Sequence, residues 1–127
     1  MLKRLLILDD NQDILNVMED ALVGEGYEVV TMTYCDDIIK SVQQHQPDLV
    51  MLDFLLSGIN GGEMCAQIKK NPLTSHLPVI ILSAYPRVLE SLGDYGSDAF
   101  VQKPFDLEQL YSTVNSCLAD DEHLQLH

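Results

Sequence analysis

The sequence predicts an α/β fold: a doubly wound (βα)₅ domain whose five-stranded parallel sheet carries helices on both faces. Short apolar runs alternate with segments of helical periodicity along the 127 residues. Uninterrupted apolar runs are typical of parallel strands that are buried on both faces. Four of the five runs are followed by a carboxylate, a hydroxyl or a lysine. In a parallel sheet these reactive groups meet outside one edge, where ligands of such folds bind.

Five strands are expected, each an apolar run that ends at a polar or turn-forming residue. They span residues 4–8, 28–33, 49–54, 78–82 and 99–102. The second of them is rich in β-branched residues, which favour strands.

Five helices are expected between and after these strands, from apolar residues at helical spacing. They span residues 12–24, 38–46, 62–70, 88–92 and 107–119. Asn11 and Asp106 are N-cap candidates, and Gln109 completes a capping-box pattern. Pro47 ends the second helix, because the residue before a proline avoids helical geometry. The fourth helix has the weakest pattern. The stripe of the last helix consists of Leu107, Leu110, Val114, Cys117 and Leu118.

One domain is expected over residues 1–119, followed by a flexible tail over residues 120–127. A length of 127 residues and an apolar fraction of 46% suit one globular core. The net charge of −13 argues against nucleic acid and anionic membranes as partners, because both attract lysine and arginine. The apolar run after Arg4 is too short for a signal peptide or a membrane span, so a cytoplasmic location is expected.

The three cysteines, Cys35, Cys65 and Cys117, are widely spaced and form no C-x-x-C motif. They predict neither a disulfide framework nor a zinc site. We expect them to be small, semi-buried apolar groups.

The polar residues after the strands predict a phosphoryl-transfer site. Asp9 and Asp10 follow the first strand, and Asp53 lies at the end of the third. Three carboxylates near one lysine, Lys103, need a further cation, and Mg²⁺ prefers such hard oxygen ligands. A metal of this kind would let the anionic Asp53 approach a phosphoryl group as a nucleophile. Lys103 could reach the phosphate or Asp53, and Ser83 offers a hydroxyl donor.

Simpler interpretations remain open for several of these residues. Asp10 could cap the first helix instead of binding metal, or do both. Ser83 could be an ordinary hydroxyl at a strand end, and Lys103 an ordinary lysine. Phe100 could be a plain core residue.

The chain resembles the receiver domain of response regulators in two-component signalling over nearly its whole length. The resemblance is carried by Asp9-Asp10, Asp53, Ser83-Ala84 and Lys103-Pro104-Phe105, each after a strand, and by the loop of residues 55–61. Each motif alone is weak, but all of them in this order are specific. The resemblance implies a flavodoxin-like receiver fold.

The resemblance also implies roles for individual residues. Asp53 would accept a phosphoryl group from a histidine of a sensor kinase or phosphotransfer protein. Asp9, Asp10, Asp53 and the main-chain carbonyl of Leu55 would hold Mg²⁺. Ser83 and Phe100 would move as a switch, and the Lys103–Pro104 peptide would be cis. A downstream protein would read the change, and a homodimer formed on phosphorylation is left open.

Phosphate lifetime in this family depends on the side chains two residues after the acceptor and two after the hydroxyl residue, here Leu55 and Tyr85. Neither can orient an attacking water through a carboxylate or amide, so a long-lived phosphate is expected. Three departures from the family pattern are Ser57, where proline is usual, Phe100, where tyrosine is commoner, and a stretch between Ser83 and Lys103 that is about two residues shorter than usual.

The expected role is a phosphoacceptor switch rather than an enzyme acting on an external substrate, with Mg²⁺-dependent self-phosphorylation and self-dephosphorylation. Two other functions compete with this interpretation. A small aspartyl-phosphate phosphatase would usually show D-x-D after the first strand, whereas here the carboxylates are adjacent. An interaction module that is never phosphorylated would not need the complete set of polar residues.

Overall fold

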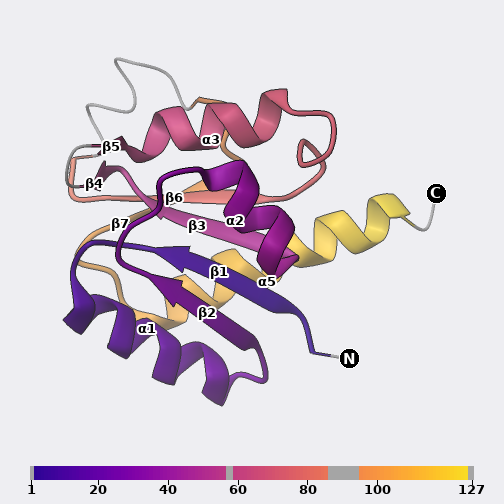
Figure 1. Ribbon diagram of the computed structural model, residues 1–127. Coiled ribbons are helices and arrows are strands. Elements are labelled where there is room, and N and C mark those ends of the chain that lie inside the picture. Colours follow the sequence, from indigo (N-terminus) through magenta and orange to yellow (C-terminus); the bar gives the residue numbers. More distant parts are fainter. Residues whose placement is uncertain (1, 57–58, 86–94, 126–127) are drawn as a thin grey trace.

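The computed structural model describes residues 2–56, 59–85 and 95–125, and it contains the predicted five-stranded parallel sheet (Figure 1). The strands are β1 (Arg4–Leu8), β2 (Glu28–Met32), β3 (Leu49–Asp53), β6 (Val79–Ser83) and β7 (Ala99–Gln102). Their order is β2-β1-β3-β6-β7. The described helices are α1 (Gln12–Gly24), α2 (Ile38–His45), α3 (Gly61–Lys70) and α5 (Leu107–Gln125).

Helices cover both faces of the sheet, α2 and α3 on one face and α1 and α5 on the other (Figure 1). Strand side chains alternate between the two faces: Leu6 and Leu8 pack with α2 and α3, whereas Leu5 and Ile7 pack with α1 and α5. Because both faces are buried, the strands can be apolar at every position, as the sequence indicated.

The helix starts confirm the predicted caps. The Asn11 side chain accepts from the main-chain N–H groups of Asp13 and Ile14, and Asp106 accepts from Gln109 at 2.7 Å. These bonds satisfy donors that the first helical turn leaves without partners.

The last helix departs from expectation in two ways. Leu107, expected in the buried stripe, is exposed, because the part of α5 that packs in the core begins only at Leu110 and continues with Val114 and Leu118. The helix also continues to Gln125, past Asp120 where the flexible tail is expected to begin. Flexibility of that tail stays a prediction.

A short antiparallel hairpin, β4 (Leu55–Leu56) with β5 (Ile59–Asn60), follows β3 and has no counterpart in the sequence prediction. Two-residue strands are too short to show a periodicity. The expected helix over residues 88–92 and the departure at Ser57 lie outside the described residues.

Two predictions about burial and membranes can be compared with the structure. Cys35 and Cys65 are fully buried rather than semi-buried, and Cys117 is partly buried. Across residues 2–56, 59–85 and 95–125, no helix combines the length and apolarity that crossing a bilayer requires.

The strand order places a topological switch point between β1 and β3. The chain leaves β1 toward β2 on one side and then returns to β3 on the other side. Loops after these two strands therefore diverge, and ligands of such folds bind outside the carboxyl edge at this point. Asp9 directly follows β1, and Asp53 is the last residue of β3.

Candidate functional site

Three carboxylates lie together at the carboxyl edge of the sheet. Asp9 and Asp10 follow β1, and Asp53 is the last residue of its neighbour β3. One oxygen of each carboxylate lies within 4.8 Å of the others. Asp9 is fully buried and Asp53 is only 7% exposed, whereas Asp10 is exposed. The fold therefore brings together the three acidic residues that the sequence singled out.

Lys103, the residue after β7, is the cation of this cluster. Its Nζ donates to Oδ2 of Asp9 at 2.7 Å and lies 3.0 Å from Oδ1 of Asp53. The pairing with Asp53 matches the prediction, and the pairing with Asp9 is an addition. The Lys103–Pro104 peptide is cis, as the resemblance implied.

The charges in the cluster perturb one another. Burial raises the pKa of Asp53 and nearby Asp9 adds to the rise, although the hydrogen bond from Lys103 acts in the opposite direction. Burial alone would lower the pKa of Lys103, but its hydrogen bonds to Asp9 and Asp53 outweigh burial and raise it. Lys103 thus stays charged at neutral pH. One ammonium between two buried carboxylates, with Asp10 beside them, leaves an excess of negative charge.

This donor set fits Mg²⁺. The three carboxylates offer hard oxygen ligands within reach of one ion, and two of them already face a shared cation. Mg²⁺ is commonly bound by one or two carboxylates, with water and a phosphate oxygen completing its octahedron.

Ser83, the last residue of β6, completes the polar edge. It is buried, and its Oγ accepts a hydrogen bond from the main-chain N–H of Tyr85 at 2.9 Å. Its main-chain oxygen accepts from the N–H of Lys103 at 2.8 Å, which ties the ends of β6 and β7 together. The hydroxyl proton can still be donated to another oxygen, because the bond from Tyr85 uses only an acceptor position.

A hollow of about 130 Å³ opens beside the Asp53 carboxylate. It is lined by Asp53, Leu55, Ser83, Ala84, Tyr85 and Lys103. These residues come from the ends of three strands, and they include both side chains expected to set the phosphate lifetime. The structure thus places Leu55 and Tyr85 at the wall of the hollow beside Asp53.

Phe100 on β7 is 45% exposed, so the interpretation as a plain core residue is wrong. It lies on the edge strand of the sheet, opposite Ile81 in the register of β6 and β7. Its movement as a switch residue stays a prediction.

Comparison with known proteins identifies the family. The family model for the response regulator receiver domain matches residues 5–115. The chain belongs to the response regulator receiver family. Response regulator protein TrrA from Thermotoga maritima, solved in complex with Mg²⁺ and BeF, is 31% identical. The match covers 92% of this receiver domain and 100% of that chain, with a TM-score of 0.83.

Two curated relatives match with similar identity. The phosphate regulon transcriptional regulatory protein PhoB of Rhizobium meliloti is 32% identical, over 93% of this chain and 53% of its own length. Response regulator ArlR of Staphylococcus aureus is 33% identical, over 91% of this chain and 52% of its own. The receiver domain thus spans about half the length of the curated relatives it matches.

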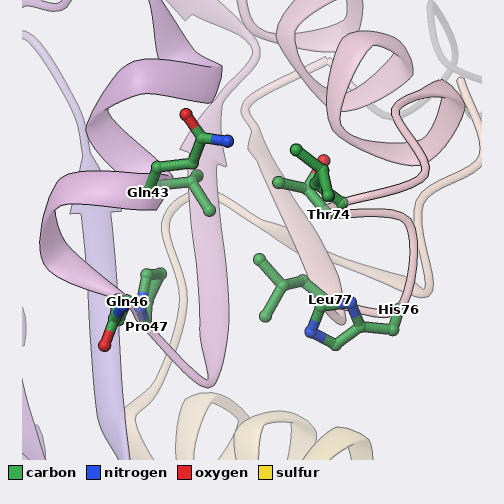
Figure 2. Close-up of a pocket in the computed structure, with 8 residues that line it drawn as sticks. Gln43, Gln46, Pro47, Thr74, His76 and Leu77 are labelled. Atoms are coloured by element: carbon green, nitrogen blue, oxygen red, sulfur yellow. The ribbon is translucent and has the colours of Figure 1, made fainter.

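A larger hollow of about 430 Å³ lies elsewhere, between α2 and the segment after α3 (Figure 2). It is lined by Val42, Gln43, Gln46, Pro47, Leu73, Thr74, His76 and Leu77. Pro47 precedes β3 and Leu77 precedes β6, so this hollow lies at the opposite edge of the sheet from Asp53. Its lining contains no carboxylate and no lysine, and it therefore lacks the acceptor carboxylate and the neutralising lysine expected of an aspartyl-phosphate site.

Two features of the receiver site were missed in the sequence. Asn60 caps α3 by accepting from the N–H groups of Gly62 and Glu63, and an Asn before two glycines was a usable signal for it. Tyr95 packs against Phe54, the residue after Asp53, and nothing in the sequence pattern pairs these two residues.

Proposed function

We propose that this receiver domain is a phosphorylation-dependent switch in which Asp53 accepts a phosphoryl group. The observation that carries the proposal is the setting of Asp53: a buried carboxylate at the end of β3, 3.0 Å from Lys103 and grouped with Asp9 and Asp10. Burying a carboxylate beside two others lowers the stability of the fold, and such costly groups cluster at functional sites, so this arrangement indicates a chemical role.

The proposed donor is a phosphohistidine of a sensor histidine kinase or of a phosphotransfer protein. An Asp53 carboxylate oxygen attacks phosphorus, a P–O bond forms, and the P–N bond to the donor imidazole breaks. Lys103 moves no proton in this step; its charge offsets the negative charge on the phosphoryl oxygens. The Ser83 hydroxyl donates to one of those oxygens.

Asp9, Asp10, Asp53 and the Leu55 carbonyl are the proposed Mg²⁺ ligands. When bound, the ion supplies positive charge that reduces repulsion between Asp53 and the incoming phosphoryl group. Support comes from the clustered carboxylates and from TrrA, which was solved with Mg²⁺ and BeF. Asp9 also accepts from the N–H of Asn11 at 2.9 Å, which fixes its orientation before any ion binds.

The proposed output is a change at the β6–β7 side of the sheet. Phosphorylation adds negative charge and acceptor oxygens next to Ser83 and Lys103, which draws both toward the phosphate. Phe100 is exposed in this structure, so its ring can turn inward when the space beside Ser83 changes. A downstream protein would recognise the altered face. A homodimer formed on phosphorylation would use the same face as its interface.

We further propose a cytoplasmic location, because three free cysteines suit a reducing compartment. Direct contact of this domain with nucleic acid or membrane is not part of the proposal, since a net charge of −13 opposes both.

The function is tested by incubating wild type and Asp53→Asn with acetyl phosphate, with Mg²⁺ or with excess EDTA, and measuring intact mass. We expect one added phosphoryl group on the wild type with Mg²⁺ only, and none on Asp53→Asn. NMR spectra of the wild type with Mg²⁺ and beryllofluoride should show shifts that extend from the acidic cluster to Phe100. Phosphorylation of Asp53→Asn at the wild-type level would refute the acceptor, and shifts confined to the acidic cluster would refute the switch.

A further inference from the structure

Tyr95 occupies the space where a side chain at position 62 would lie. A Cβ built on Gly62 would stand 2.5 Å from Cδ2 and Cε2 of the Tyr95 ring, a distance that real Cβ atoms do not show. Residue 62 is in the first turn of α3, and Tyr95 lies 33 positions further along the chain. The glycine therefore leaves room for the ring that packs on it and, on another side, for Oδ1 of Asn60, which would lie 2.9 Å from the same Cβ.

Tyr95 itself is held in an unusual backbone conformation. Its φ is 57°, in the left-handed region that bulky residues rarely adopt. Such a conformation persists only where the surroundings determine it, and it often accompanies function. The Tyr95 ring also packs against the ring of Phe54, with centroids 6.0 Å apart and planes tilted by 44°. One side chain thus contacts both ends of the segment from Phe54 to Gly62.

That segment begins at the acceptor. Phe54 directly follows Asp53, and its oxygen accepts from the N–H of Gly61 at 2.9 Å. Gly61 in turn packs on the main chain of Asp53, since a Cβ there would overlap the Asp53 oxygen. The base of the β4–β5 hairpin is therefore closed by Phe54 and Gly61. Leu55, the proposed carbonyl ligand, lies just inside this closed base.

We propose that Tyr95 is a positioning residue for the Mg²⁺ site. By packing on Phe54 and Gly62 it holds the base of the hairpin, and with it the Asp53 carboxylate and the Leu55 carbonyl, in the geometry that the ion requires. Tyr95 touches neither the ion nor the phosphate. The inference rests on the proposed function, because it concerns the same metal site.

The test compares Mg²⁺ dissociation constants, measured by NMR titration, for the wild type, Tyr95→Ala and Tyr95→Phe. Tyr95→Ala should weaken Mg²⁺ binding by about fivefold, the lower end of typical coupling between sites. Tyr95→Phe should bind as the wild type does, because the contact is made by ring carbons. The matched control is Tyr111→Ala, since Tyr111 is also partly buried but packs on the opposite core with α1 and α5. It should lose stability without changing Mg²⁺ affinity.

Gly62→Ala provides an independent approach to the same ring from the other side. Alone it should displace the ring and weaken Mg²⁺ binding, whereas in the Tyr95→Ala background its effect should be clearly smaller, because only the 2.9 Å approach of the new Cβ to Asn60 Oδ1 is left. Such non-additivity is expected only if both changes act through the ring. The inference would be overturned if Tyr95→Ala and Tyr111→Ala bound Mg²⁺ equally well. It would also be overturned if Gly62→Ala weakened Mg²⁺ binding by the same factor with and without Tyr95→Ala. In either case, Mg²⁺ binding by the wild type would still uphold the proposed function. Failure of the wild type itself to bind Mg²⁺ would overturn both.

Discussion

A mostly buried lysine lies near each end of the parallel strands and bridges two segments of the chain, but the two lysines have very different partners. At the carboxyl edge, Lys103 is 15% exposed and contacts Asp9 and Asp53, whose side chains are 0% and 9% exposed. At the opposite edge, Lys69 is 19% exposed and contacts Asp98, whose side chain is 42% exposed. Lys69 also donates to the main-chain oxygen of Leu77 at 2.7 Å.

This difference separates a structural ion pair from a chemical site. Water can solvate Asp98 if Lys69 is lost, and Asp98 keeps its hydrogen bond from the N–H of Val79. Asp9 and Asp53 have little access to water and depend on a cation. The larger hollow is not the one beside the buried charges: its volume is about 430 Å³ at the opposite edge, against about 130 Å³ beside Asp53. Buried unbalanced charge therefore marks the site better than available space does.

The largest expected effect is on stability, from removing the two lysines in turn. Lys103→Ala should lower the free energy of unfolding by about 3 kcal/mol at pH 7, because it leaves buried carboxylates without a partner. Lys69→Ala should lose about 1 kcal/mol or less, since its partner is half-exposed. Urea unfolding followed by circular dichroism measures both.

Mg²⁺ sharpens this experiment. Addition of Mg²⁺ should stabilise Lys103→Ala more than it stabilises the wild type, because the ion replaces the missing positive charge, whereas Lys69→Ala, whose Mg²⁺ site is intact, should gain only as much as the wild type does. Equal losses for the two variants, or equal responses to Mg²⁺, would erase the contrast between the edges.

The next effect in size is on the lifetime of the phosphate. The double variant Leu55→Asn, Tyr85→Glu should shorten it roughly ten- to a hundredfold, because it places groups that can orient water in the hollow beside Asp53. The control, Leu73→Asn, His76→Glu, changes the other hollow and should leave the lifetime unaltered. Loss of label from phosphorylated protein with Mg²⁺ gives both rates. A wild-type half-life of seconds, or no difference between the two double variants, would show the prediction wrong.

The smallest effect is the pH dependence of Asp53. Its pKa is raised on folding, chiefly by burial, so the folded protein holds that proton more tightly than the unfolded chain does. Ionised Asp53 therefore lowers stability as the pH rises above its ordinary value of 3.8. Asp53→Asn should be more stable than the wild type at pH 7, by on the order of 1 kcal/mol, and the advantage should vanish below about pH 4.

Asp98→Asn is the control for this titration. It removes a half-exposed carboxylate that pairs with Lys69, so no gain in stability is expected. Thermal unfolding between pH 4 and pH 8 compares the two variants with the wild type. An advantage of Asp53→Asn that grows as the pH falls would contradict the sign of the pKa shift.

Much of this contrast could be predicted from the sequence, because the positions of the strands along the chain and their polar ends are local information. An apolar run that ends at Asp53 or Lys103 indicates both a buried strand and the position of its polar end. Parallel topology then brings these ends together without knowledge of any side-chain contact. The five strands and the acidic cluster follow from this reasoning.

Other features depend on packing that the sequence does not display. The pairing of Lys103 with Asp9, and not only with Asp53, depends on which carboxylate is buried more deeply. The contact of Tyr95 with Gly62 joins residues from two separate connections. Leu107 continues the apolar pattern of its helix but extends beyond the core, and periodicity alone cannot show where a core ends.

The pairing of Lys103 with Asp9 joins positions 94 residues apart, across strands that lie on either side of β3 and β6. We expect contacts of such long range to form late in folding, because the chain loses the entropy of closing the long loop before the contact can stabilise it. During synthesis Asp53 emerges well before Lys103, but it lacks its counter-charge until the edge strand β7 has docked. The proposed competence of Asp53 to accept phosphate is therefore expected to arise only after β7 has docked. A chain that has lost β7 should not be phosphorylated by the proposed histidine kinase.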